Sequence, residues 1–131
     1  MLYNDNKYIN FNKKNAMKTN ELRIGNYVNY FSEGADKWFV TEIDINDMIC
    51  IHENTIDHAE PIPLTEEWLI RFGFKYYKSW NYWQIMGCNR VKLRQFLDDF
   101  HIIDRYHIKI ETVHKLQNYF FALTDEELII D

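Results

Sequence analysis

Residues 61–86 read PIPLTEEWLIRFGFKYYKSWNYWQIM, and this stretch decides the fold class. Its first three residues place two prolines around an isoleucine, a pattern that interrupts regular structure. Thr65 and the two glutamates behind it have the pattern of a helix N-cap followed by acids at the positive helix end. Gly73 is suited to stop this helix at about Phe72. The stretch therefore predicts a short helix after Pro63.

Two aromatic runs follow that glycine, at 74–79 and 82–86, and they flank a Trp-Asn pair. This arrangement predicts a β-hairpin. Upstream, residues 27–31, 37–43 and 48–52 are rich in β-branched and aromatic side chains and are separated by turn-forming residues. They predict three short antiparallel strands.

Downstream, apolar residues of 91–99 and Phe100 recur at helical spacing and predict another short helix. Apolar and polar residues alternate over 106–110, which is typical of a half-buried strand. Residues 128–130 form an apolar run that predicts a last strand.

The short helix predicted at 91–99 depends on four apolar side chains at helical spacing, namely Leu93, Phe96, Leu97 and Phe100.

The clearest helix of the sequence lies at 113–123, with Thr112 as its cap. Its apolar residues recur every three or four positions, so one face should pack on the sheet. We expect the buried face to consist of Val113, Leu116, Phe120 and Leu123, and the outward face to include His114, Lys115 and Asn118.

These elements predict an α+β protein with a small antiparallel sheet, a short helix after Pro63 and a C-terminal amphipathic helix. A chain of 131 residues fits one ordinary domain. The polar, Asn- and Lys-rich start predicts a flexible extension over 1–18. Residues 19–131 should then form a single domain.

Composition excludes several classes of protein. Hydrophobic residues make up 47% and charged residues 27%, which is typical of a folded globular chain. Aromatic residues make up 17%, so we expect some rings to be exposed for contact. No apolar run approaches the ~20 residues of a membrane span, which predicts a cytoplasmic protein. Cys50 and Cys88 lack the spacing of a disulfide or zinc framework and are expected to be reduced thiols.

Charge is segregated along the chain, and the net charge is −5. Such a balance argues against simple duplex binding, which needs clustered lysine and arginine. Segregated charge can steer a charged partner. The segment 41–67 contains acids and no lysine or arginine, namely Glu42, Asp44, Asp47, Glu53, Asp57, Glu60, Glu66 and Glu67. The segment 68–97 contains bases and no acid, namely Arg71, Lys75, Lys78, Arg90, Lys92 and Arg94.

The sequence gives little support for a catalytic site or a metal site. The histidines and cysteines lack the paired spacing of a zinc site, and the four glycines form no phosphate loop, so no cofactor or catalytic residue is predicted. Exposed or hydrogen-bonded histidines are the simpler interpretation. Two groups contain residue types that can bind a metal: Cys50 with His52 and His58, and Asp104 with His101 and His107. The acids of a hypothetical magnesium-dependent nuclease are Asp98, Asp99, Asp104 and Glu111.

The basic, aromatic stretch 71–94 is the most suggestive feature. Cations interleaved with rings are the combination that holds single-stranded nucleic acid. The alternative is a hairpin whose alternate rings form a core face while its lysines are solvated. Both interpretations stay open. The candidate nucleic-acid-binding residues are Arg71, Lys75, Tyr77, Lys78, Trp80, Trp83, Arg90, Lys92 and Arg94.

Three segments, KTNELRIGNYV at 18–28, PIPLTEEWL at 61–69 with FGF at 72–74, and VHKLQNYFFALT at 113–124, resemble a family of small proteins of Bacteroidetes phages and prophages. The likeness covers about a third of the chain and brings no catalytic residue. It implies a phage-borne, non-enzymatic protein similar in kind to anti-CRISPR inhibitors, with a type VI-B RNA-targeting effector as the target.

The expected function is therefore counter-defence: binding a host CRISPR effector nuclease or its guide RNA, with no membrane and no small-molecule substrate involved. The alternatives are an accessory module that binds single-stranded nucleic acid through the basic hairpin, and the nuclease above. An acidic surface could meet a basic channel of the effector. Its candidate residues are Glu42, Asp44, Asp47, Glu53, Asp57 and Glu60.

Overall fold

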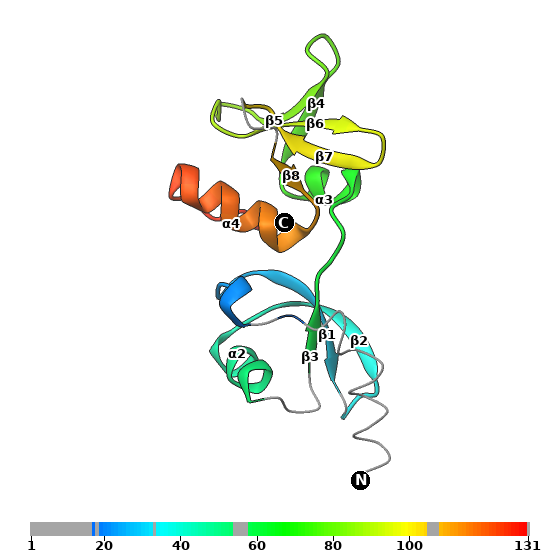
Figure 1. Ribbon diagram of the computed structural model, residues 1–131, viewed down its shortest axis with the longest axis vertical. Coiled ribbons are helices and arrows are strands. Elements are labelled where there is room, and N and C mark those ends of the chain that lie inside the picture. Colours follow the sequence, from blue (N-terminus) through cyan, green and yellow to red (C-terminus); the bar gives the residue numbers. More distant parts are fainter. Residues whose placement is uncertain (1–16, 18, 33, 54–57, 105–107, 131) are drawn as a thin grey trace. The chain divides into compact units, whose positions relative to one another are not determined.

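The computed structural model describes residues 17, 19–32, 34–53, 58–104 and 108–130. The chain divides into two compact units, Met1–Ile62 and Pro63–Asp131. Each unit contains its own antiparallel sheet (Figure 1). The predicted α+β class with a C-terminal helix is confirmed, although the β-structure is divided between two sheets. In the described parts, no helix is long and apolar enough to cross a membrane.

The first unit holds a three-stranded sheet of order β2-β1-β3, with bounds β1 Tyr27–Ser32, β2 Lys37–Glu42 and β3 His58–Glu60. A short 3-10 helix, η1 (Thr19–Glu21), precedes it. The first two strands are those that the sequence predicts. Among the described residues of this unit, seven buried ones form a hydrophobic core, with Met48 packed against them: Met17, Leu22, Val28, Tyr30, Ile43, Ile51 and Ala59.

Met17 belongs to this core, although the sequence pattern places it in the N-terminal extension. Its backbone N–H donates to the carbonyl of Ala59 at 3.1 Å, which ties it to β3. Residues 1–16 and 18 lie outside the described residues.

The predicted strand at 48–52 is wrong, because this segment belongs to helix α2 (Ile45–His52). Asp44 caps the helix: its carboxylate accepts from the Asp47 N–H, and the Asp47 carboxylate accepts from the Asp44 N–H, both at 2.9 Å. This reciprocal capping box satisfies backbone donors that the first helical turn would leave unpaired. Residues 45–47 therefore start a helix instead of forming a turn.

The second unit begins with the predicted helix, α3 (Glu66–Arg71). Thr65 is its N-cap, with its hydroxyl 3.4 Å from the Trp68 N–H that donates to it. Gly73 follows the helix with φ of +93°, a conformation that glycine adopts without strain. The predicted hairpin is also confirmed, as β4 (Phe74–Tyr77) and β5 (Tyr82–Ile85).

The predicted short helix at 91–99 is wrong, because this segment forms β6 (Lys92–Phe96) and the start of β7 (Asp99–Ile102). Leu97 takes a left-handed φ of +58° in the two-residue turn between them. Leu93 is buried while Phe96 and Leu97 are 69% and 82% exposed. The apolar residues at helical spacing therefore do not share one buried face.

A fifth strand, β8 (Lys109–Ile110), completes the order β4-β5-β6-β7-β8. It contains the end of the strand predicted at 106–110, of which Tyr106 and His107 lie outside the described residues. Helix α4 (Val113–Thr124) follows as predicted. The segment 128–130 is not a strand: Leu128 is buried, and its carbonyl accepts from Gln117 Nε2 at 3.3 Å.

Helix α4 buries a broader surface than the sequence predicts. Val113, Leu116 and Phe120 are buried as expected, and Leu123 is half-buried. His114, expected to face outward, is buried instead, and its Nδ1 lies 3.2 Å from the hydroxyl of Thr112. The Phe120 ring meets the Phe74 ring edge-on at 6.4 Å, so the helix packs on the sheet through β4.

Candidate nucleic-acid interface

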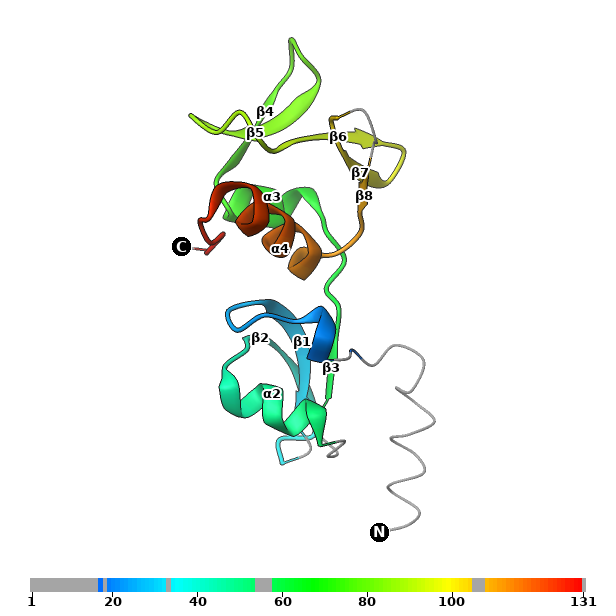
Figure 2. The ribbon, with the colours of Figure 1, turned by 60° about the vertical axis from the view of Figure 1, so that its left-hand side comes forward.

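The sheet of the second unit has one face covered by helices and one face turned away from them. Figure 2 shows α3 and α4 on the same side of β4–β8. Because side chains alternate along a strand, strand pairing sorts the residues onto the two faces. The covered face carries the buried side chains Phe74, Trp83, Leu93, Phe100, Ile102 and Ile110.

The opposite face, here called the open face, carries the alternate residues of the same strands. Lys75 pairs with Gln84 and Tyr77 with Tyr82 across β4 and β5. Gln84 pairs with Lys92 across β5 and β6, and Arg94 on β6 is two residues further along the same face. The open face of β4–β6 therefore gathers three cations and two tyrosines that are separated in the sequence: Lys75, Tyr77, Tyr82, Lys92 and Arg94.

The two tyrosines are held as a pair. The ring centroids of Tyr77 and Tyr82 are 5.9 Å apart with an interplanar angle of 53°. Lys92 Nζ lies 5.2 Å from the Tyr82 ring centroid, which is cation–π distance. Both rings are half-buried, so each keeps part of its surface accessible. Gln84 is buried in this face and donates to the Cys88 carbonyl at 2.6 Å.

Arg94 links this face to the tip of the hairpin. Its Nε donates to the Asn81 carbonyl at 3.1 Å and its Nη2 to the Trp80 carbonyl at 3.2 Å. Asn81 is left-handed, with φ of +57°, and its Oδ1 accepts from the Tyr76 hydroxyl at 2.6 Å. These contacts fix a turn that presents Trp80, which is 65% exposed and lies two residues after the exposed Lys78.

Three of the nine candidate residues lie elsewhere. Trp83 is only 6% exposed on the covered face, so it cannot stack on a base. Arg71 is on α3, with its guanidinium carbon 4.4 Å from the Trp68 ring centroid. Arg90 Nη1 donates to the Leu123 carbonyl at 2.9 Å, near the end of α4. The other six gather on the open face or at the hairpin tip.

The open face also carries residues that are not among the nine candidate nucleic-acid-binding residues. They include the ring Tyr82 and, from β6 to β8, Phe96, His101 and Lys109. Arg94 pairs with His101, and His101 pairs with Lys109. Tyr82 could have been found from the predicted hairpin, in which it pairs with Tyr77. The places of Phe96, His101 and Lys109 depend on strand pairing that leaves no local signal in the sequence.

The acidic candidates have varied roles in the first unit. Asp44 and Asp47 are engaged in the capping box of α2, and the donated Asp47 N–H lowers the pKa of the Asp44 carboxyl. Glu53 follows α2 as its C-cap residue and is exposed, Glu42 ends β2, and Glu60 is half-buried in β3. Asp57 lies outside the described residues.

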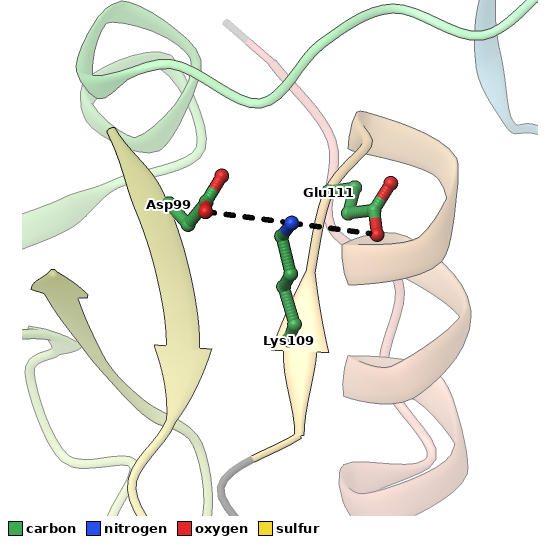
Figure 3. Close-up of polar contacts among 3 residues, drawn as sticks. All are labelled: Asp99, Lys109 and Glu111. Atoms are coloured by element: carbon green, nitrogen blue, oxygen red, sulfur yellow. Dashed lines mark ion pairs between the residues drawn. The ribbon is translucent and has the colours of Figure 1, made fainter. Parts of the chain in front are cut away.

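The acids of the nuclease hypothesis do not gather into one site. Lys109 Nζ lies between Asp99 Oδ2 at 3.4 Å and Glu111 Oε1 at 3.8 Å (Figure 3). Asp98 is in the turn after β6, and Asp104 accepts from the Tyr119 hydroxyl at 3.4 Å. Partial burial and the charge of Asp104 raise the pKa of Tyr119.

Metal chemistry gains no support from the described residues, among which no three His, Cys, Asp or Glu side chains are grouped as metal ligands. His52 Nδ1 lies 3.4 Å from the hydroxyl of Thr19. Cys50 and Cys88 are half-buried thiols. Of the second set, His107 lies outside the described residues.

Comparison with known proteins leaves the open face as the main guide to function. No protein-family model, curated protein or solved structure matches the chain. The resemblance to phage proteins stays an expectation based on the segments quoted above.

Proposed function

We propose that this protein is a non-enzymatic binding protein that holds single-stranded RNA on the open face of its β4–β8 sheet. The observation that carries the proposal is the strand pairing that gathers Lys75, Tyr77, Tyr82, Lys92 and Arg94 on the face away from the helices. Backbone-paired strands hold these groups in fixed relative positions.

Physical chemistry favours an unpaired strand as the ligand. Stacking of a base on an aromatic side chain contributes about 1–3 kcal/mol, and every base has a face to offer. The Tyr77 and Tyr82 rings provide such surfaces, and the neighbouring cations provide charge for phosphates. A duplex hides its base faces, so it could use only the cations. With a net charge of −5 for the chain, cations alone make a poor duplex-binding surface.

We propose counter-defence as the biological setting of this binding. The phage resemblance implies an inhibitor of a type VI-B effector in the bacterial cytoplasm, and an RNA-guided nuclease carries guide RNA with unpaired segments. RNA is preferred over DNA as the ligand on this ground. In this proposal, the open face holds guide RNA in the effector complex and thereby prevents target cleavage.

Fluorescence anisotropy with labelled oligouridine, measured over a range of salt concentrations, tests the binding itself. Tyr82→Ala should weaken binding roughly 5- to 150-fold, the equivalent of one lost stacking contact. Lys75→Gln should lower the salt slope by about 1. The matched control is Lys115→Gln on α4, an exposed lysine on the helix side of the sheet.

Three results would contradict the proposal: no binding by the parent at low salt, binding unchanged in both open-face variants, or tighter binding of a duplex of the same sequence. Equal binding of single-stranded DNA would contradict the preference for RNA. Thermal unfolding of each variant shows whether a weaker affinity reflects loss of fold.

The counter-defence setting has its own test, a target-RNA cleavage assay with a type VI-B effector loaded with guide RNA. The parent should inhibit cleavage, and Tyr82→Ala should inhibit less at equal concentration. Undiminished cleavage, with no co-purified complex, would contradict this setting. If Tyr82→Ala inhibits fully but Glu42→Gln or Glu53→Gln does not, the acidic surface of the first unit is the interface.

A further inference from the structure

The balance of charged side chains on the open face changes between β6 and β8. On this face, Arg94 of β6 pairs with His101 of β7. The next pair of the same two strands on this face is Phe96 with Asp99. The register of β7 and β8 places Glu111, one residue past β8, opposite Asp99. Lys109 lies between these two acids, with N–O distances of 3.4 and 3.8 Å (Figure 3).

This group of three residues, here called the acidic clamp, has two negative charges and one positive charge. The side chains of Asp99, Lys109 and Glu111 are 48%, 43% and 56% exposed, so a passing phosphate would meet them. Lys109 is already paired on both sides, and a phosphate placed on it would also approach two carboxylates. Like charges at a few ångströms repel even in a partly solvated setting, so the clamp disfavours phosphate.

The β4–β6 part of the same face has the opposite balance. Lys75, Lys92 and Arg94 lie there, and β4, β5 and β6 contain no acid. The boundary between the two parts falls at β7, where His101 lies between Arg94 and Lys109 in the pairing.

We infer that the RNA site ends at β6 and that the acidic clamp sets this limit. The site then takes a short unpaired segment of about two or three nucleotides, as expected for a sheet that stacks bases on a few accessible rings. The inference rests on the proposed RNA binding and adds to it the size of the ligand and the residues that determine it. Longer RNA would bind through the same short segment and gain little.

The test compares oligouridines of roughly three and roughly nine nucleotides on the parent and on Asp99→Asn/Glu111→Gln, lengths that lie below and above a typical site size. The double substitution removes the two carboxylates and leaves Lys109 free to meet a phosphate. We expect the parent to bind the longer RNA more tightly only by the statistical factor of about seven, because roughly nine nucleotides contain about seven overlapping stretches of three. The double variant should bind the longer RNA several-fold more tightly than the parent does, with a salt slope larger by about 1.

Two further variants separate this effect from a general change in charge. Glu66→Gln/Glu67→Gln on α3 makes the same change in net charge on exposed residues of the covered side, and it should not increase the length dependence. Adding Lys109→Gln to the double variant should abolish its gain, whereas Lys109→Gln in the parent should leave affinity unchanged. Thermal unfolding confirms that each variant is folded.

A parent that already binds the longer RNA more tightly by much more than the statistical factor would overturn the inference, because its site would then extend past β6. A double variant that behaves like the α3 control would overturn it as well. If the parent binds neither length at low salt, the proposed function fails and the inference fails with it. This last result differs from the first two, in which RNA binds but its length limit is assigned wrongly.

Discussion

At the scale of single residues, Trp80 and Trp83 are three positions apart in the chain, yet one ring is exposed and the other is buried. Trp80 belongs to the Trp-Asn pair of the predicted hairpin and Trp83 to the aromatic run that follows it, and both are candidates by residue type. Trp80 sits in the turn and is 65% exposed, whereas Trp83 is on the covered face of β5 and is 6% exposed. The place of a ring in the hairpin, in the turn or on the covered face of a strand, decides whether it is accessible to a ligand, and the residue type does not.

His114 is a second residue whose surroundings override its usual behaviour. Burial, and then the charge of Lys115, lower the pKa of His114 from its ordinary 6.5 to about 4. The folded protein therefore holds this imidazole neutral at a pH where the unfolded chain would protonate it. The unfolded state gains more protons between these values, so protonation favours unfolding as the pH falls.

We therefore predict that the stability contributed by a neutral His114 is complete above pH 6.5 and is lost progressively as the pH falls toward 4. Denaturant unfolding at a series of pH values measures this as a falling free energy of unfolding. His114→Gln should flatten the curve in this window, because glutamine does not titrate. A variant curve with the same slope as the parent would show that other groups cause the loss.

At the scale of elements, local signals predict some segments well and fail for others. Helix α3 follows from Thr65 and Gly73, which act within the segment itself. The β6–β7 hairpin could not be found this way, because its apolar residues coincide with helical spacing and only pairing across the sheet decides between the two. In α2, the capping pair Asp44 and Asp47 is visible in the sequence, but the strand-like runs on either side of 45–47 favour a turn there.

Only part of the candidate site could be predicted from the sequence, namely the part that lies on the β4–β5 hairpin. The alternation of Lys75 and Tyr77 on one face follows from the hairpin, which local turn residues indicate. The neighbouring positions of Lys92 and Arg94 depend on β6 pairing with β5, and this long-range contact leaves no local trace. The acidic clamp depends in the same way on the register of β7 and β8.

Helix α4 should contribute to stability rather than to binding. Phe120 is 4% exposed and meets Phe74 edge-on, so Phe120→Ala should lower the free energy of unfolding by about 3–5 kcal/mol, the usual cost of truncating a buried phenylalanine. Denaturant unfolding measures this loss. RNA affinity per folded molecule should be unchanged. A Phe120→Ala protein that unfolds like the parent yet fails to bind RNA would make this helix part of the interface.

At the scale of the whole molecule, the distribution of charge matters more than its sum. The acidic block belongs mainly to the Met1–Ile62 unit and the basic block to the Pro63–Asp131 unit, so one chain carries surfaces suited to partners of opposite charge. A net charge of −5 is compatible with RNA binding if the cations are gathered where the rings are. Folding of residues 19–131 as a single domain stays a prediction.

The most direct test of this account is an NMR titration of the ¹⁵N-labelled protein with short oligouridine, followed through backbone amide shifts. If RNA binds the open face, the amides of α2 and of β8 should change little. The largest shifts should then fall on β4, β5 and β6, at Lys75, Tyr77, Tyr82, Lys92 and Arg94. Shifts concentrated on the acidic segment 42–53, or an unchanged spectrum at saturating RNA and low salt, would contradict binding on the open face.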